Sequence, residues 1–372
     1  MVRYPLGGML SWAMQYALGL QRLGHQVFLL ERADYPNACF DPQCRAISDD
    51  CRPGYARVRT LLARFGLDQQ LIFQAADGQL YGSDRAGLDA LFRSADLLID
   101  GGNHGAWLAE ARSAGLPTVL IDGEPGFTQM KMVQEQADGK SSEDFDYYFS
   151  NGANIGTPQS SAPSAGRCWG HVFNPVDTES FAPIPPPSKG CFTTVMNWQS
   201  HAPLRFNGKT YGQKDLEFAR FLSLPQRVAV PLEVAAAGQA PRQQLQAHGW
   251  RLRDAHQVTD TYDGYRSYIA GSLGEFSVCK NVFVATRSGW FSDRSAAYLA
   301  SGRPVVLQDT GFSAHLPCGE GLFAVSDVEQ SVAALEEIVS DYPRHARRAR
   351  ELAETYLDAR LLMGRLLTDV GL

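Results

Sequence analysis

The chain has 372 residues, of which 44% are hydrophobic and 20% are charged, and its net charge at pH 7 is −6. These values are ordinary for a globular protein, and the length predicts two domains. The acidic balance and the scattered basic residues disfavour a nucleic-acid partner, and no apolar stretch reaches the roughly 18 residues of a membrane span, so we expect no integral membrane association and a cytoplasmic protein.

The first elements alternate between helix and strand. Apolar residues at three- and four-residue spacing predict a helix over 9–26, and the strand "VFLLE" follows at 27–31. A first helix in a doubly wound fold normally follows a strand, yet only "MVRYP" stands before Gly7. Either the first strand is stunted or the chain begins late, and we favour a start site downstream of the original one.

Further along, the strands "ADLLID" (95–100) and "TVLID" (118–122) enclose the helical segment 106–115. Runs of consecutive apolar residues suit strands buried on both faces of a parallel sheet. These segments therefore predict a βαβ unit.

The composition changes near the middle of the chain. A polar loop is predicted at 157–166, and the proline-rich segment 181–190 predicts a stiff linker between domains. The alternation then restarts, with strands predicted at 191–198, 230–237, 280–286, 303–309 and 322–326, and helices near 212–223, 240–248, 261–271, 292–301 and 327–341.

The predicted fold class is therefore α/β with two tandem Rossmann-like domains, at 1–180 and 181–350. The last helices, over 343–370, are amphipathic and rich in arginine. We expect the end of the chain, 351–372, to pack back on the first domain.

Seven cysteines occur without a CxxC pair, so we expect free thiols and no metal site.

Two polar loops are predicted at the carboxyl ends of neighbouring strands. They are "SGWFSDR" (288–294), which leads into a helix, and "DTGF" (309–312). Helix N-termini and glycine-rich turns at this edge of a parallel sheet suit an anionic group such as a diphosphate, although polar caps and glycines are also ordinary turn chemistry. The candidate ligand-binding residues in these loops are Ser292, Asp293, Arg294, Thr310, Gly311 and Phe312.

The run from 281 to 341 resembles the donor-binding half of GT-B glycosyltransferases, in its "NVFVATRSGWFSDRSAAYLASGRPVVLQDTGF" and "GLFAV" segments. A second match is "FNPVDTESF" (173–181), with Pro175 where the family has glycine. The resemblance implies a nucleotide-sugar donor bound by the second domain, a small-molecule or glycan acceptor bound by the first, and transfer without a metal or other cofactor.

One departure from the family bears on the donor site. Many retaining members carry two glutamates with seven residues between them, and the matching positions here are Gly289 and Ala297. Ser292, Asp293 and Arg294 are the best substitutes, since Asp accepts hydrogen bonds from hydroxyls and Arg binds phosphate bidentately. Because both carboxylates are missing, a nucleotide-sugar epimerase and a non-catalytic sugar-nucleotide binding protein remain alternatives to a glycosyltransferase.

The family also places basic residues after the first strand of the second domain. Arg205, Lys209 and Lys214 fit by neighbourhood, and Lys209 is preferred.

Candidate catalytic groups follow the first-domain strands. His104 lies in "DGGNHG", and Asp122 and Glu124 lie in "DGEPGF". The usual pKa of histidine suits a general base, so His104 is the first candidate, with the two acids orienting it or holding acceptor hydroxyls.

Overall fold

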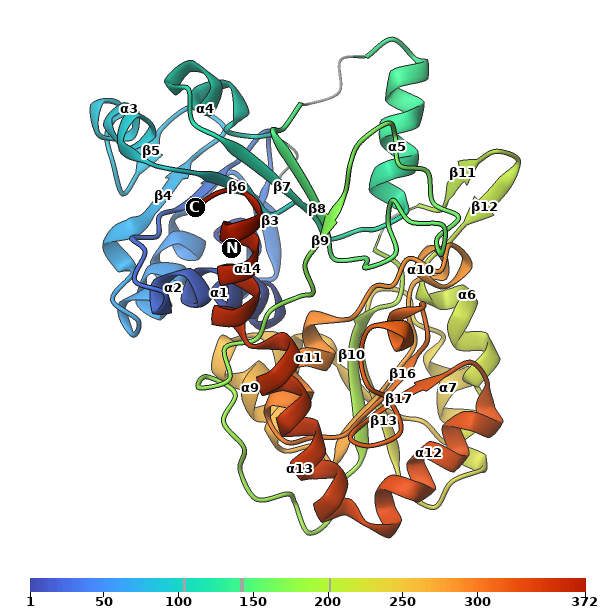
Figure 1. Ribbon diagram of the computed structural model, residues 1–372. Coiled ribbons are helices and arrows are strands. Elements are labelled where there is room, and N and C mark those ends of the chain that lie inside the picture. The colour runs from blue at the N-terminus through green and yellow to red at the C-terminus, as the bar shows by residue number, and fades with distance from the viewer. Residues whose placement is uncertain (103–104, 141–143, 201) are drawn as a thin grey trace.

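The computed structural model describes residues 1–102, 105–140, 144–200 and 202–372. It consists of two α/β halves, one above the other in Figure 1, with the C-terminal helices running from the second half back to the first. The expected α/β class with two Rossmann-like units is confirmed.

The first half contains a three-stranded sheet, ordered β1-β4-β5, and a four-stranded sheet, ordered β6-β7-β8-β9. Their strands are β1 (Leu29–Arg32), β4 (Leu71–Gln74), β5 (Leu80–Tyr81), β6 (Leu98–Asp100), β7 (Thr118–Asp122), β8 (Tyr147–Ser150) and β9 (Gly170–His171). Among the described residues β1 pairs only with β4 and β6 only with β7. Residues 1–6 form no strand.

The helices of the first half lie around these sheets. They are α1 (Gly7–Arg22), α2 (Arg52–Ala63), the 3-10 turn η1 (Asp68–Gln70), α3 (Arg85–Ser94), α4 (Leu108–Ala114) and α5 (Phe127–Ala137), and a hairpin of β2 (Cys39–Asp41) and β3 (Ala46–Ser48) precedes α2. The predicted βαβ unit is present as β6, α4 and β7.

The second half is built on one six-stranded parallel sheet with the order β14-β13-β10-β15-β16-β17. Its strands are β10 (Phe192–Asn197), β13 (Leu232–Ala237), β14 (Arg251–Asp254), β15 (Gly274–Ser277), β16 (Val305–Gln308) and β17 (Leu322–Val325). The chain builds outward from β10 in one direction and then, from β15, in the other. The strand order therefore reverses between β10 and β15.

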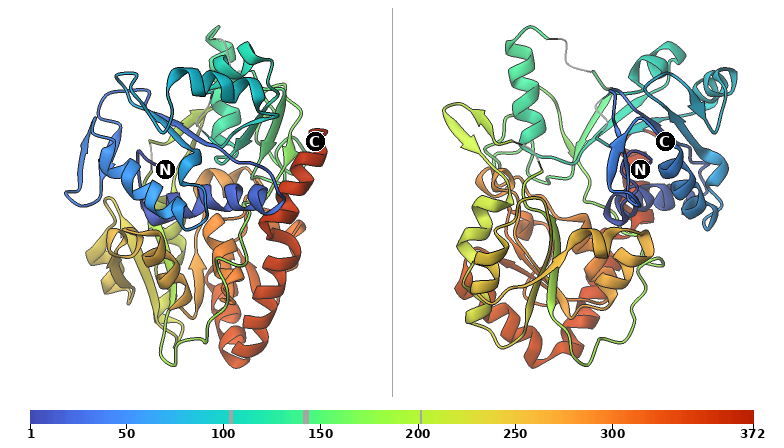
Figure 2. Two further views of the ribbon diagram at one scale, coloured as in Figure 1. Left: turned by 90° about the vertical axis from the view of Figure 1, so that its left-hand side faces the viewer. Right: turned by 180° about the vertical axis from the view of Figure 1, so that it is seen from behind.

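Helices cover both faces of this sheet (Figure 2). They are α6 (Lys214–Phe218), α7 (Arg242–Ala247), α8 (Ala255–Thr259), α9 (Tyr262–Ala270), α10 (Asn281–Ala285), α11 (Asp293–Ala300) and α12 (Val328–Ser340), with the 3-10 turns η2 (Ala219–Phe221), η3 (Leu224–Gln226) and η4 (Phe312–Ala314). A hairpin of β11 (Leu204–Phe206) and β12 (Lys209–Tyr211) precedes α6. No described helix is long and apolar enough to cross a lipid bilayer.

The prediction of a strand at 280–286 is wrong. This segment contains α10, and the strand β15 lies immediately before it in the chain. A short apolar run can form a buried helical turn as readily as a strand. Here Val282 and Phe283 of α10 are buried in the cluster that joins the two halves.

The chain crosses between the halves twice at one place. Val176, on the way to the second half, donates its N–H to Leu357 O, and its carbonyl accepts from Ala359 N, both at 2.9 Å. The returning segment is α13 (Tyr342–Leu352), the π-turn η5 (Ala353–Leu357) and α14 (Ala359–Asp369). Figure 2 shows these helices rising along one side of the molecule, and α14 packs on α1 as expected.

Gly19 of α1 sets the close approach of these two helices. A Cβ at Gly19 would lie 2.7 Å from Ala359 O and 2.8 Å from Met363 Cγ. We expect Gly19→Ala to lower the free energy of unfolding by about 1–3 kcal/mol, because overpacking forces the helices apart. Urea denaturation measures this change.

Gly364→Ala on α14 is the matched control, because its Cβ would meet only Leu23, at 3.8 Å. The control is expected to be neutral or stabilising, since alanine favours helix over glycine. Equal stability of the two variants would contradict the close α1–α14 contact.

Candidate active site

The carboxyl ends of β10 and β15 mark the position where ligands bind in open parallel sheets. Strand order reverses between these two strands, and the crevice outside such a reversal is the usual ligand site. Two loops meet there: the loop that leads into α6, and the loop that joins β15 to α10. Gly212 N donates to Asn281 Oδ1 at 3.1 Å, and Asn281 N donates to Gln213 O at 3.3 Å.

Lys214, the first residue of α6, follows directly on this contact. Its side chain is buried, and it has no hydrogen bond or salt bridge to any residue that the structure describes. Burial first, and then the positive charges of Arg294 and Lys280, lower the pKa of Lys214 to about 7. A buried amine without a partner is costly unless an anion accompanies it. Lys214 is therefore the strongest candidate for a phosphate ligand.

Lys280 lies between β15 and α10 and connects the two halves. Its amine forms a salt bridge with Glu124 Oε1, from the loop after β7. Lys280 is nearly buried, whereas Glu124 is part-exposed. Of the two acids predicted in this loop, Glu124 is thus the one that reaches the second half.

Asp122 serves the structure of the same loop. Its carboxylate accepts hydrogen bonds from Thr128 Oγ1 at 2.6 Å, from Gln129 Nε2 and Ser150 Oγ at 2.8 Å, and from Glu124 N at 2.8 Å. Burial raises the pKa of this carboxyl. These four donors hold the backbone that carries Glu124. A catalytic role for Asp122 stays a prediction, and His104 lies outside the described residues.

Arg294 of α11 is directed into the second half, where it binds three groups. Its guanidinium contacts Glu275 Oε1 at 2.5 Å, Val195 O at 2.7 Å and Ser277 Oγ at 2.7 Å. It therefore links α11 to β10 and β15. A contact of Arg294 with a donor phosphate stays a prediction. The positive charge of Arg294 acts on Lys214 from this position.

We expect Arg294→Met to lower the free energy of unfolding by about 3–5 kcal/mol, because it leaves the Glu275 carboxylate buried without its cation. Glu275 is fully buried. Urea denaturation measures the loss, with Arg93→Met as the control, since Arg93 is exposed on α3. Unchanged stability of Arg294→Met would show that the ion pair is dispensable.

The other residues of the two predicted loops lie close together, but the first loop follows α10 and not a strand as predicted. Ser292 is the N-cap of α11, and its buried hydroxyl has no partner in the described part of the chain. Asp293 is part-exposed. Thr310 donates to Trp290 O at 2.6 Å, which ties the second loop to the first.

Gly311 and Phe312 complete the second loop. Gly311 has a φ of 98°, and a Cβ there would lie 2.6 Å from Asn154 Nδ2 of the first half. Phe312 is fully buried against Phe291. The glycine therefore allows close approach of the first half, and the aromatic ring anchors the loop.

Arg205 and Lys209 lie elsewhere, on the exposed β11–β12 hairpin beside α5 (Figure 1). Gln134 of α5 donates to Arg205 O at 2.8 Å. The structure brings neither side chain into contact with Lys214 or Lys280, so a donor role for the two stays a prediction. Among the described residues no group of three or more His, Cys, Asp and Glu side chains is placed to bind a metal.

No protein-family model and no curated protein matches the sequence. Solved structures do match over the whole chain. HepE from Anabaena, in complex with UDP and glucose, is 13% identical, with a TM-score of 0.52 over 93% of this chain and 99% of that one. An alpha-glucosyltransferase in complex with UDP is 10% identical, with a TM-score of 0.57 over 99% and 97%.

A glycosyltransferase from Rickettsia africae is 9% identical, with a TM-score of 0.51 over 98% of this chain and 94% of that one. The chain has the GT-B fold. In this GT-B chain the positions of the family's two glutamates are Gly289, at a φ of 75°, and the buried Ala297. Gly289 O accepts from Ala153 N of the first half at 3.3 Å.

Sequence reasoning missed Lys280 because it began a segment predicted as a strand. Lys214 was only one of three basic residues in its loop, and nothing local distinguishes it from Lys209. Lys214 is distinguished only by its place in the folded protein, where it is buried beside two other cations at the strand-order reversal.

Proposed function

We propose that this protein is a glycosyltransferase that transfers a sugar from a nucleotide-diphosphate donor to a hydroxyl of a small-molecule or glycan acceptor. The observation that carries the proposal is the unpartnered Lys214 amine beside Arg294 and Lys280 at the carboxyl ends of β10 and β15. An anion there would balance the local positive charge, and a diphosphate is the anion that such an enzyme must hold.

UDP-glucose is the first donor to test. HepE and the alpha-glucosyltransferase are each described in complexes with UDP and with UDP-glucose. The alpha-glucosyltransferase is also described with DNA. For the present chain we propose a non-nucleic-acid acceptor, because a net charge of −6 disfavours binding to a phosphate backbone.

Glu124 and Lys280 suggest how donor binding prepares the site. Without donor, their salt bridge joins the halves. A diphosphate would compete for the Lys280 amine, and the Glu124 carboxylate would then accept a proton from the acceptor hydroxyl. Lys214 and Lys280 would then stabilise the leaving diphosphate, which is the task that a metal performs in other transferases.

A thermal-shift screen against nucleotide sugars tests the donor proposal. A ligand at 100 times its dissociation constant should stabilise the folded protein by about 2.7 kcal/mol. We expect UDP-glucose or another nucleotide sugar to raise the melting temperature, and the free sugar to leave it unchanged under the same conditions. No shift with any nucleotide sugar would contradict the proposal.

Two alternatives to a glycosyltransferase can be distinguished by whether the donor is turned over. Turnover of the donor without an acceptor would favour an epimerase. Tight donor binding without turnover over a broad acceptor panel would favour a sugar-nucleotide binding protein, an alternative that Gly289 and Ala297 support because they replace two carboxylates.

A further inference from the structure

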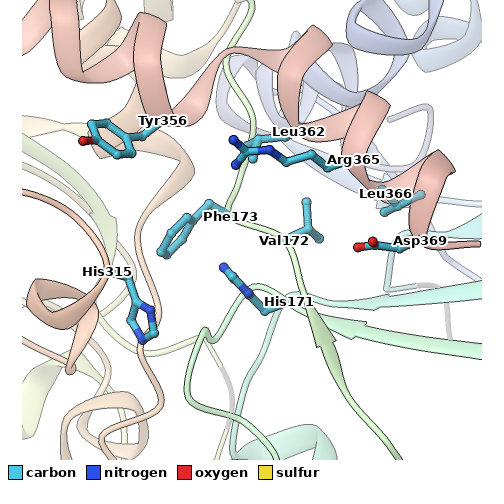
Figure 3. A pocket seen from close by; sticks show the side chains of 9 residues that line it. All are labelled: His171, Val172, Phe173, His315, Tyr356, Leu362, Arg365, Leu366 and Asp369. Carbon is cyan, nitrogen blue, oxygen red and sulfur yellow. The ribbon is translucent and has the colours of Figure 1, made fainter.

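A cavity that Lys214 and Lys280 do not line lies where the C-terminal helix meets both halves. Its volume is about 320 Å³. Figure 3 shows the side chains around it, which come from β9 and the segment after it, from the segment after η4, and from η5 and α14. The lining residues are His171, Val172, Phe173, His315, Tyr356, Leu362, Arg365, Leu366 and Asp369. We refer to it as the hinge pocket.

The hinge pocket combines apolar and polar surfaces. Val172, Phe173, Leu362 and Leu366 are buried and give it apolar walls. The polar ends of the other lining side chains surround these walls in Figure 3. Such a combination is typical of pockets for small organic molecules, and the volume is at the lower end of their range of roughly 300–1,000 Å³.

Three polar side chains that line the pocket are exposed. His171, Arg365 and Asp369 make no hydrogen bond or salt bridge with any residue that the structure describes. Arg365 and Asp369 are one helical turn apart on α14 and line the same cavity, yet no salt bridge joins them. Their donors and acceptors are available to a ligand.

The two histidines come from different halves. The His171 and His315 rings lie 5.9 Å apart between centroids, and His315 Nε2 lies 2.8 Å from Asn154 Oδ1. Asn154 also donates to Arg287 O at 2.9 Å, and it lies against Gly311 in the predicted donor loop. A ligand in the hinge pocket would therefore touch both halves. Asn154 also connects the hinge pocket to the predicted donor loop.

The charge state of the pocket favours a neutral ligand. Partial burial, followed by the charges of His315 and Arg365, lowers the pKa of His171 and so favours the neutral imidazole. A neutral imidazole both donates and accepts hydrogen bonds. Arg365 adds donors and Asp369 adds acceptors, whereas Asp369 would repel a phosphate.

Hydroxyl groups need donors and acceptors side by side, and the C–H face of a sugar ring needs an apolar wall. We propose that the hinge pocket binds a sugar ring of the acceptor substrate. The proposal rests on the proposed transferase function, and it assigns the acceptor class as a saccharide. It also identifies Arg365 and Asp369 as residues that bind hydroxyls.

Saturation-transfer NMR with a panel of monosaccharides and methyl glycosides tests the assignment, and a parallel titration with UDP monitors the donor site. We expect at least one saccharide to bind the wild-type protein. Arg365→Gln and Asp369→Asn should each lower the affinity for that saccharide by about tenfold or more, as expected when hydrogen bonds to a charged group are lost. The affinity for UDP should be unchanged. Neither variant removes a hydrogen bond or salt bridge within the described protein, so both should fold.

Arg347→Gln, an exposed position on α13, is the control and should change neither affinity. The assignment is overturned if no saccharide binds, if both variants bind it as the wild type does, or if UDP affinity falls together with saccharide affinity. Failure of the transferase proposal is a separate result, namely the absence of any nucleotide-sugar binding by the wild-type protein.

Discussion

Lys214→Met is expected to weaken UDP-glucose binding by about 10- to 100-fold, because a hydrogen bond to a charged group contributes about 1.5–3 kcal/mol. The substituted side chain has a similar length and removes the amine of a buried side chain that has no partner among the described residues. The variant should therefore fold at least as stably as the wild type. Calorimetric titration with UDP-glucose measures the affinity.

The same residue predicts a pH dependence. Without ligand the pKa of Lys214 is about 7, and a bound diphosphate favours the charged amine and raises this pKa. Binding then takes up a proton above pH 7, so affinity should be highest below pH 7 and fall as the pH rises through 7 to 9. Lys214→Met should lose this dependence.

The stability of the unliganded protein should change in the opposite direction. The pKa of Lys214 is lowered from its usual value to about 7, so between pH 7 and the usual range of lysine the unfolded chain binds more protons than the folded one. The contribution of Lys214 to stability therefore improves as the pH rises above 7. If Lys214→Met keeps wild-type affinity and wild-type pH dependence, the phosphate binds elsewhere.

Glu124→Gln is expected to lower donor turnover by about 100- to 10,000-fold, the range for loss of a general base. Donor affinity should change little or improve, because the variant releases Lys280 from its salt bridge. The measurement is the rate of UDP release from UDP-glucose, with saccharide acceptors and with water alone.

Glu135→Gln is the control for this prediction, since Glu135 is exposed on α5. It should retain wild-type turnover and affinity. Full turnover in Glu124→Gln would remove this residue from the catalytic candidates. The same assay on His104→Ala would then test the base that was first favoured from the sequence.

Most strands of the second half could be predicted from the sequence because they are short, mainly apolar runs. The central strand β15, "GEFS", was missed because it is short and contains Glu275. β13 and β16 lie within the segments predicted for them. The edge strand β14, "RLRD", was missed because its pattern is polar, and only pairing with β13 makes it a strand. The short apolar run of α10 was predicted as a strand because periodicity cannot separate a strand from a helix over so few residues.

The candidate site was predictable in part. Glu124 was named from the end of β7, whereas the loop between β15 and α10, which carries Lys280, was missed because 280–286 was predicted as a strand. The roles of Arg294 and Lys214 depend on partners distant in sequence: Arg294 meets the Glu275 carboxylate, whereas Lys214 lies near cations without a carboxylate of its own. No local pattern reveals which of two basic side chains has such a partner.

The most direct test of a diphosphate-dependent sugar transfer is the release of UDP from UDP-glucose in the presence of a saccharide panel, compared between the wild type and Lys214→Met. Our account predicts release by the wild type that at least one saccharide stimulates, with a glycosylated product, and loss of that release in Lys214→Met. Bound UDP-glucose without any transfer over the panel, or equal release by the two proteins, would contradict it.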